Sequence, residues 1–291
     1  MRRALCALLC ALLLTFGCAK RRAAADVFFD RLPREDWDRC PLLRLTAFDT
    51  DQSDCLLLEC GGEAMMVDGG TAAFGDALAD ALREMGVTRF RYLLNTHYHE
   101  DHISGLRELM RRGFVAGAYL TPYGDFASRV NELQKQTPEQ AALSGVPVFQ
   151  VASGDMLLLG EAVLTVLRHD EGLSTNGRSL IVHARFGDAT LLLTADIIGD
   201  TQTWCVRHLP ASLLDVDVLK APHHGITAMA PAFWQAASPR ALLITNTPAR
   251  AADTQAQADR AGVPALFSGV GRVVMETDGD DWYIYQQKGS F

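Results

Sequence analysis

The sequence NTHYHEDHISG, residues 95 to 105, gathers three of the chain's eight histidines and two acidic residues into six consecutive positions. Residues two apart at the end of a strand point the same way, so His97 and His99 can present their imidazoles to one metal ion. Asp101 and His102 follow where the chain turns into a helix, and they can face a second ion. The alternative is a solvated polar turn in which Asp101 caps the helix. The spacing favours a strand-to-helix turn that feeds two metal ions.

Apolar runs that end in turn residues extend from this segment in both directions. They predict strands at residues 42–48, 55–60, 64–70, 89–97, 146–151, 156–160, 162–168, 179–187, 189–197, 215–225, 241–246, 272–279 and 281–286. Apolar residues at helical spacing predict helices at residues 74–85, 102–113, 126–136, 200–209, 230–237 and 254–262. The run of strands between residues 146 and 197 predicts a meander. Two halves that each mix strands with helices favour an α/β fold with two sheets packed face to face and helices outside.

Composition and charge narrow the classes of protein and of partner. Apolar residues make up 48% of the 291 residues and charged residues 21%, as in an ordinary globular protein. We expect one domain, residues 40–288, since mixed folds of this size commonly form a single unit. The formal net charge of −8 gives no general attraction to polyanions. Long nucleic acid is therefore a disfavoured partner.

Residues 1–25 have the layout of a secretory signal. Two arginines precede an apolar run at residues 4–16, which is shorter than the roughly 20 residues a spanning helix needs. Gly17 and Cys18 then resemble the lipobox of bacterial lipoproteins, in which the cysteine is lipidated. We expect export, with the protein either anchored to the outer face of the cell membrane through a lipid on Cys18 or secreted.

Four cysteines, Cys40, Cys55, Cys60 and Cys205, remain outside the leader. Cys55 and Cys60 bracket a predicted strand, so they should lie on opposite faces and about 16 Å apart, too far to bridge each other. A bridge from Cys40 to either of them is possible in an exported protein. Buried thiols are the favoured interpretation.

The histidine motif resembles the metal-binding signature of the metallo-β-lactamase fold superfamily, whose members form a four-layer αββα sandwich with a dinuclear metal site at the sheet edges. Asp68 in MMVDGG matches the aspartate that closes an early strand in that superfamily. Asp196 in LLLTADI matches the bridging aspartate. His223 and His224 in VDVLKAPHHG match the position of a final histidine, of which the site needs one.

Within the superfamily, the sequence is most similar to the hydrolase domain of the DNA-uptake protein ComEC and its stand-alone relatives. The segments DQSDCLLLECGGEAMMVDGG, LLLTADI and DVLKAPHHGI occur in the same order, and the resemblance spans residues 43–286. Three departures affect the substrate side. Asn176 stands where most superfamily members have a third histidine for the first ion, and His169 is the alternative nearby. HHGI has lost a hydroxyl, and the segment NTPARAADTQ lacks a histidine.

The resemblance implies a role for each site residue. His97, His99 and Asp196 would hold one divalent ion, and Asp101, His102, Asp196 and His223 the other. Asp68 would orient a ligand imidazole, and Asn176 would lie beside the first ion. Asp101 could also accept a proton, and His224 could face the substrate as an electrophile or proton donor.

The implied function is that of an exported metal-dependent hydrolase whose two ions, zinc or alternatively manganese, activate water. A small phosphodiester-type substrate is expected. The alternatives are a lactone or β-lactam hydrolase of the same superfamily and a non-catalytic metal-binding surface protein. Neither the substrate nor the oligomeric state follows from the sequence.

Overall fold

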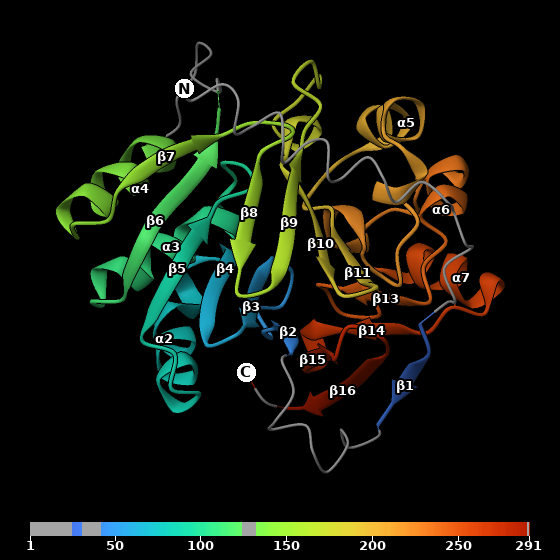
Figure 1. Ribbon diagram of the computed structural model, residues 1–291, viewed down its shortest axis with the longest axis horizontal. Helices are drawn as coiled ribbons and strands as arrows, with labels where there is room; N and C mark the ends of the chain where they lie inside the picture. The colour runs from blue at the N-terminus through green and yellow to red at the C-terminus, as the bar shows by residue number, and fades with distance from the viewer. Residues whose placement is uncertain (1–24, 31–41, 124–131, 290) are drawn as a thin grey trace, which may run out of the picture.

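Two β-sheets lie face to face in the computed structural model, and helices cover their outer faces (Figure 1). The structure describes residues 25–30, 42–123, 132–289 and 291. Residues 1–24 of the predicted leader, which include Cys18, and Cys40 lie outside the described residues. The four-layer αββα sandwich expected from the sequence is confirmed.

Within the described residues, nine strands form the first sheet. In sheet order they are β1 (Val27–Phe29), β16 (Trp282–Lys288), β15 (Gly271–Thr277), β2 (Leu43–Ala47), β3 (Cys55–Cys60), β4 (Glu63–Gly69), β5 (Arg89–Leu94), β6 (Val115–Pro122) and β7 (Val148–Val151). The strands β4 to β7 are parallel to one another. The helices of this half are α2 (Gly75–Glu84), α3 (Glu100–Arg111) and α4 (Glu132–Leu143).

The second sheet has seven strands in the described part of the chain. In order they are β14 (Ala265–Phe267), β13 (Ala241–Ile244), β12 (Val218–Lys220), β11 (Ala189–Leu193), β10 (Ile181–Phe186), β9 (Ala162–Leu167) and β8 (Met156–Leu159). The strands β8 to β11 form an antiparallel meander, whereas β11 to β14 are parallel. The helices α5 (Gly199–His208), α6 (Pro231–Ala237) and α7 (Ala252–Ala261) complete this half.

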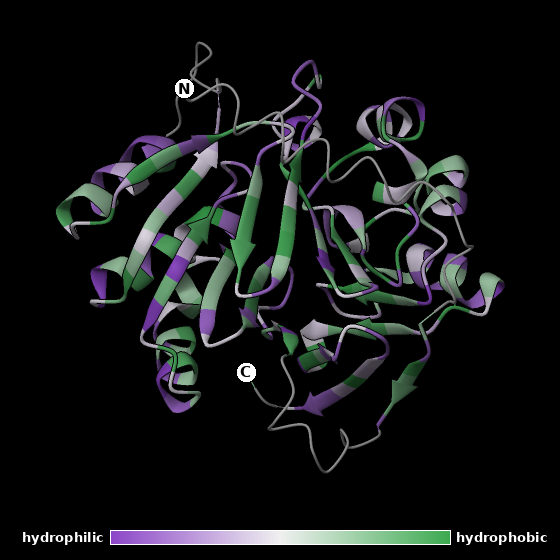
Figure 2. Cartoon of the chain, in the orientation of Figure 1, coloured by the Kyte–Doolittle hydropathy of each residue, from purple (hydrophilic) through white to green (hydrophobic). Residues whose placement is uncertain are grey.

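Three apolar clusters hold the four layers together. One joins the facing sides of the two sheets, a second joins the first sheet to α2 and α3, and a third joins the second sheet to its helices. Figure 2 shows hydrophobic residues along the strands of both sheets. Cys60 belongs to the cluster between the sheets and Cys55 to the one beneath the helices. The two are buried thiols on opposite faces of β3, as predicted, and Cys205 is also a buried thiol.

The carboxyl ends of the parallel strands bring the polar residues together. Asp68 lies at the end of β4, the histidine turn follows β5, Asp196 follows β11, and His223 and His224 follow β12. Parallel strands end at the same edge of a sheet, which is where open α/β sheets hold their ligands.

Two glycines allow α3 to sit directly on β4. A Cβ built on Gly105 would lie 1.7 Å from the carbonyl oxygen of Gly69, and one built on Gly69 would lie 2.5 Å from the backbone nitrogen of Leu106. The Gly105 amide donates to the carbonyl oxygen of Gly70 at 2.9 Å. The first turn of α3, which carries His102, is thereby fixed against the end of β4, which carries Asp68.

Several sequence expectations need correction at the level of elements. The run at residues 146–151 forms β7 at the edge of the first sheet, so it is not the first strand of the meander. The strands β1, β6 and β14 were not predicted. The predicted helix 126–136 overlaps α4, which continues to Leu143, and residues 124–131 lie outside the described part. No helix in the described ranges has an apolar stretch long enough to cross a bilayer.

Candidate metal centre

The predicted histidine turn leads from β5 into α3. His97 and His102 are fully buried, whereas His99, the residue before the first turn of α3, is exposed. Nε2 of His97 lies 3.2 Å from Nδ1 of His99. The ring centroids of His97 and His102 are 4.1 Å apart. The turn therefore gathers three imidazoles at the edge of the sheet.

Asp68 holds the ring of His102 from behind. Its Oδ2 lies 2.7 Å from Nδ1 of His102 and accepts from the Thr96 hydroxyl at 2.6 Å. Its Oδ1 accepts the backbone N–H of Thr96 at 2.8 Å. The other ring nitrogen of His102, Nε2, lies 3.3 Å from Oδ2 of Asp196. Asp68 thus has the geometry of the orienting carboxylate that was predicted.

Asp196 lies at the centre of the cluster. Its Oδ2 is 3.7 Å from Nε2 of His97 and 3.9 Å from Nε2 of His223. Its Oδ1 is 3.4 Å from Nε2 of His224. Asp196 therefore lies against histidines of both predicted ion sites, and its role as a bridge stays a prediction.

His223 and His224 differ in burial, and His224 is the buried member of the pair. Both residues have left-handed backbones, with φ of 50° and 53°, a conformation that is costly outside glycine and concentrates at functional sites. This turn directs His224 inward, where it is 1% exposed and its Nε2 lies 3.2 Å from Oδ2 of Asp101. The side chain of His223 is 34% exposed. His224 therefore lies beside Asp101 within the cluster, and His223 lies at its more exposed edge.

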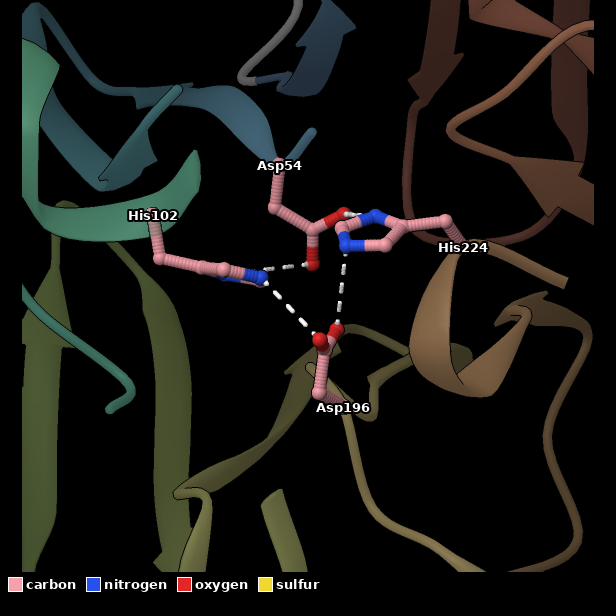
Figure 3. Close-up of side chains that lie close together, drawn as sticks. All are labelled: Asp54, His102, Asp196 and His224. Carbon is pink, nitrogen blue, oxygen red and sulfur yellow. Dashed lines mark hydrogen bonds and ion pairs between the residues drawn. The ribbon is translucent and has the colours of Figure 1, made fainter. Parts of the chain in front are cut away.

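Sequence reasoning missed three residues behind His224. Oδ1 of Asp54 lies 3.1 Å from Nδ1 of His224 and accepts from the Thr245 hydroxyl at 2.6 Å. Nζ of Lys220 lies 2.5 Å from Oδ2 of Asp54, and both side chains are buried. Figure 3 shows His102 and His224 entering from opposite sides, with Asp54 and Asp196 between them. The signal was present, because DQSD and DVLK were both part of the family resemblance.

Asn176, and not His169, lies against the cluster. Nδ2 of Asn176 is 3.3 Å from Nε2 of His223. His169 stacks on Trp204 with ring centroids 5.0 Å apart, and its Nδ1 lies 3.4 Å from the Thr201 hydroxyl. His169 therefore belongs to the packing of α5 against the neighbouring loop.

The buried charges compensate one another strongly. Burial lowers the pKa of His97 well below its usual range. Burial also disfavours protonation of His102 and His224, but the neighbouring carboxylates together outweigh it, Asp196 and Asp68 at His102 and Asp196, Asp54 and Asp101 at His224. The pKa of His102 therefore lies well above its usual range, and that of His224 is raised to about 10. Burial opposes ionisation of Asp196, but these two histidines hold the pKa of its carboxyl well below its usual range. Without metal, protons on these histidines supply the positive charge that balances Asp196. A bound metal ion could supply that charge in their place.

The donor atoms fit divalent metal ions. Among the described residues, two clusters bring their ligand atoms within 4.8 Å of one another. One consists of Asp54, His102, Asp196 and His224, and the other of His97, His99 and Asp196. Nε2 of His102, Nε2 of His224 and Oδ1 of Asp196 are buried and make no hydrogen bond of acceptable geometry within this part of the structure. Buried polar atoms without partners are costly, and imidazole with carboxylate is a donor set that zinc accepts.

The cluster divides into two groups of side chains that share Asp196. The inner group is Asp101, His102, Asp196 and His224, and the outer group is His97, His99 and Asp196. Asp54 is left out of the inner group because its oxygens already contact Lys220, Thr245 and Nδ1 of His224. The predicted ligands all lie in this cluster, and their roles as ligands stay predictions.

Comparisons with known proteins agree with the fold. Coenzyme F420H(2) oxidase from Methanothermobacter marburgensis is 30% identical over 135 residues, which cover 45% of this chain and 31% of the oxidase. The solved structure of CmlA, a diiron beta-hydroxylase from Streptomyces venezuelae, superposes with a TM-score of 0.54 at 16% identity over 85% of this chain and 55% of CmlA. The chain thus spans less than two thirds of either protein.

Two shorter proteins are similar along most of their own length. The metallo-beta-lactamase fold protein YhfI from Bacillus subtilis has a TM-score of 0.51 at 13% identity, over 78% of this chain and 96% of YhfI. Igni18, a metallo hydrolase from Ignicoccus hospitalis, has a TM-score of 0.50 at 13% identity, over 85% of this chain and all of Igni18. The sequence model of the metallo-beta-lactamase superfamily matches residues 48–230. Since that match covers more than half of the chain and includes the histidine turn and both groups, the chain belongs to the metallo-beta-lactamase superfamily.

Proposed function

We propose that the protein is an exported, zinc-dependent hydrolase that acts on a small phosphodiester-type substrate. The observation that carries the proposal is the convergence of three buried ligand atoms that make no hydrogen bond of acceptable geometry to any described residue, Nε2 of His102, Nε2 of His224 and Oδ1 of Asp196. A cluster of this kind costs free energy in a folded protein unless an ion occupies it.

Two divalent ions would be held by the two groups, with Asp196 between them. Imidazole and carboxylate donors suit zinc, and manganese is the alternative where carboxylates dominate. Bound ions of this type supply Lewis acidity and lower the pKa of a water molecule toward neutrality.

The chain's own residues would position the substrate and move the proton. Asp101 is one third exposed (32% of its side chain), so its carboxylate can reach both the inner group and the open side, where it would accept a proton. His223 and Asn176, which lie 3.3 Å apart, stand at the half-exposed edge beside Asp196. Their N–H groups would donate to substrate oxygens.

The choice of substrate rests on the sequence. The similarity to ComEC-like hydrolases over residues 43–286 favours a phosphodiester, and the net charge of −8 favours a small one over long nucleic acid. The fold alone does not decide, since one fold hosts many reactions. The similar proteins include an oxidase, a diiron hydroxylase and a metallo hydrolase, which illustrates this range.

Metal analysis followed by a substrate panel tests the proposal. The purified mature protein should retain about two zinc ions after gel filtration, as expected for a dinuclear site. It should then hydrolyse a bis-aryl phosphate or an aryl phosphorylcholine faster than nitrocefin or an acyl lactone. Asp196→Asn is the blank. Less than one bound ion after incubation with zinc or manganese would overturn the metal centre.

The panel also separates the alternatives. Turnover of nitrocefin or the lactone alone would assign the protein to β-lactam or lactone hydrolysis. Bound metal with no turnover on any of the four substrates would indicate a metal-binding surface protein. Loading the same preparation with iron and measuring oxygen consumption would reveal oxidase chemistry.

Export and lipid anchoring are tested separately. Expression of the full chain should place the protein in the membrane fraction, and Cys18→Ala should release it. If the variant stays with the membrane, a lipid on Cys18 is not the anchor.

A further inference from the structure

We propose that Asp54 and Lys220 are a positioning pair that fixes the ring of His224, so that its Nε2 points into the inner group. The inference deepens the proposed function, because it rests on a metal ion bound there. Neither residue was predicted to act at the site. Asp54 lies between His102 and His224, across the cluster from Asp196 (Figure 3), and Nζ of Lys220 lies 3.9 Å from Oδ1 of Asp196.

The contacts of Asp54 leave its carboxylate no freedom. Oδ1 accepts from the Thr245 hydroxyl at 2.6 Å and lies 3.1 Å from Nδ1 of His224, and Oδ2 lies 2.5 Å from Nζ of Lys220. An acceptor at Nδ1 requires the proton to be on that nitrogen, which leaves Nε2 with a lone pair for a metal ion. Asp54 therefore fixes both the tautomer and the direction of the ring.

Lys220 balances the charge of Asp54 from inside the protein. Its side chain is fully buried, and Nζ also donates to the carbonyl oxygen of Ala195 at 2.9 Å. A buried carboxylate without a cation is unstable, so Asp54 needs a positive charge that stays when metal leaves. The bond to Ala195 also ties Lys220 to the residue before Asp196. One lysine thus supports a residue on each side of the inner group.

The arrangement repeats that of Asp68 and His102. Asp68 contacts Nδ1 of His102 at 2.7 Å, and Asp54 contacts Nδ1 of His224 at 3.1 Å. The two histidines come from opposite sheets, one after β5 and the other after β12. In each case the ring nitrogen remote from the carboxylate faces Asp196, at 3.3 and 3.4 Å. The inner group is therefore built from two histidines that are each held from behind.

Metal affinity of the Asp54→Asn variant tests the proposal. Asp217→Asn is the matched control, because Asp217 is a buried aspartate that accepts from Thr190 at the other end of β12. Zinc retention is measured by competition with a chelator. Asp54→Asn should weaken the binding of one ion by about 10–100-fold, whereas the control should bind both ions as the wild type does. Equal zinc retention in the two variants would overturn the proposal.

Nitrogen-15 NMR spectra of the histidine rings give a signal that does not change with the stability of the protein. In the zinc-loaded wild type, Nδ1 of His224 should carry a proton that is protected from exchange with water. That protection should be lost in Asp54→Asn and kept in Asp217→Asn. A His224 ring protonated at Nε2 in the wild type would contradict the proposal.

The role of Lys220 is separated from that of Asp54 by a double substitution. Lys220→Met should lower the melting temperature, because Asp54 then lacks its cation, and adding Asp54→Asn should recover part of the loss. Zinc affinity of the double variant should equal that of Asp54→Asn. The double variant carries no buried charge at either position, so its zinc affinity can be measured even if a single variant fails to fold. No recovery of stability would show that Lys220 does not serve Asp54.

The outcomes distinguish this inference from the proposed function. A wild-type protein that binds no zinc contradicts both. A wild type that binds zinc without hydrolysing the phosphodiesters contradicts only the proposed substrate. Normal zinc binding by Asp54→Asn in an active protein contradicts only the positioning pair.

Discussion

The inner and outer groups share Asp196 but differ in how their histidines are held. In the inner group, His102 and His224 are buried and each has a carboxylate behind its ring. In the outer group, His99 is exposed and Nδ1 of His97 has the Thr96 hydroxyl at 3.1 Å in place of a carboxylate. A carboxylate behind a ligand imidazole raises its basicity and fixes its orientation. We therefore expect the inner ion to be bound tightly and the outer ion to exchange.

Asp196→Asn should have the largest effect, because it removes the one residue common to both groups. Metal analysis should show the loss of both ions after gel filtration. The rate of hydrolysis should fall by more than about 100-fold. This exceeds the loss typical of removing a carboxylate that only supports a metal ligand. A variant that keeps one tightly bound ion would show that the groups do not depend on a shared bridge.

Stepwise chelation tests the comparison itself. The wild-type protein should release one ion at a chelator concentration about 10–100-fold below that needed for the second. His99→Ala should abolish the first step and leave the second, whereas His102→Ala should remove the tighter step. The bound zinc per protein at each chelator concentration is the measurement. Simultaneous release of both ions would make the two groups equivalent.

Asp68→Asn should have a smaller effect that is confined to the inner group. Asp68 contacts His102 and Thr96, so its loss should free the His102 ring without removing a ligand. Zinc affinity of the tighter step should fall by about 10–100-fold, while the weaker step stays unchanged. A change in the weaker step alone would show that Asp68 serves His97 instead.

The gathering of His97, His99, Asp101 and His102 at one turn could be predicted because its signal is local. His97 to His102 are neighbours in sequence, and the strand-to-helix turn fixes which way each side chain points. The strand from Cys55 to Cys60 was predicted in full, since its apolar residues are bounded by turn residues. The strand β6 was missed because Val115–Pro122 contains alanine and glycine, which disfavour strands.

The support of His224 could not be predicted because it depends on the packing of the two sheets. Asp54 and His224 are 170 residues apart, and their contact exists only because β3 and β12 belong to facing sheets. The buried position of His224 and the more exposed position of His223 depend on two consecutive left-handed residues, which nothing in a pair of histidines signals. Lys220 was unnoticed because a lysine at the end of an apolar strand usually faces solvent.

Asn176→His should have the smallest effect, and it would act on the outer group alone. Nδ2 of Asn176 lies 3.3 Å from Nε2 of His223, and the sequence resemblance predicts a third histidine at this position in most members of the superfamily. An added imidazole there should raise the affinity of the outer group for its ion about tenfold. This is the lower end of the range by which substitutions near metal ligands change metal affinity. The first chelation step should therefore move toward the second.

His169 provides a contrast with Asn176, because its ring packs on Trp204 and not on the metal-site cluster. His169→Ala should leave both chelation steps unchanged, because His169 belongs to neither group. If His169→Ala weakens the first step while Asn176→His has no effect, the outer ion is completed by His169. The loop that carries both residues must then rearrange when metal binds. If Asn176→His merges the two steps, the weakness of the outer group is due to that single asparagine.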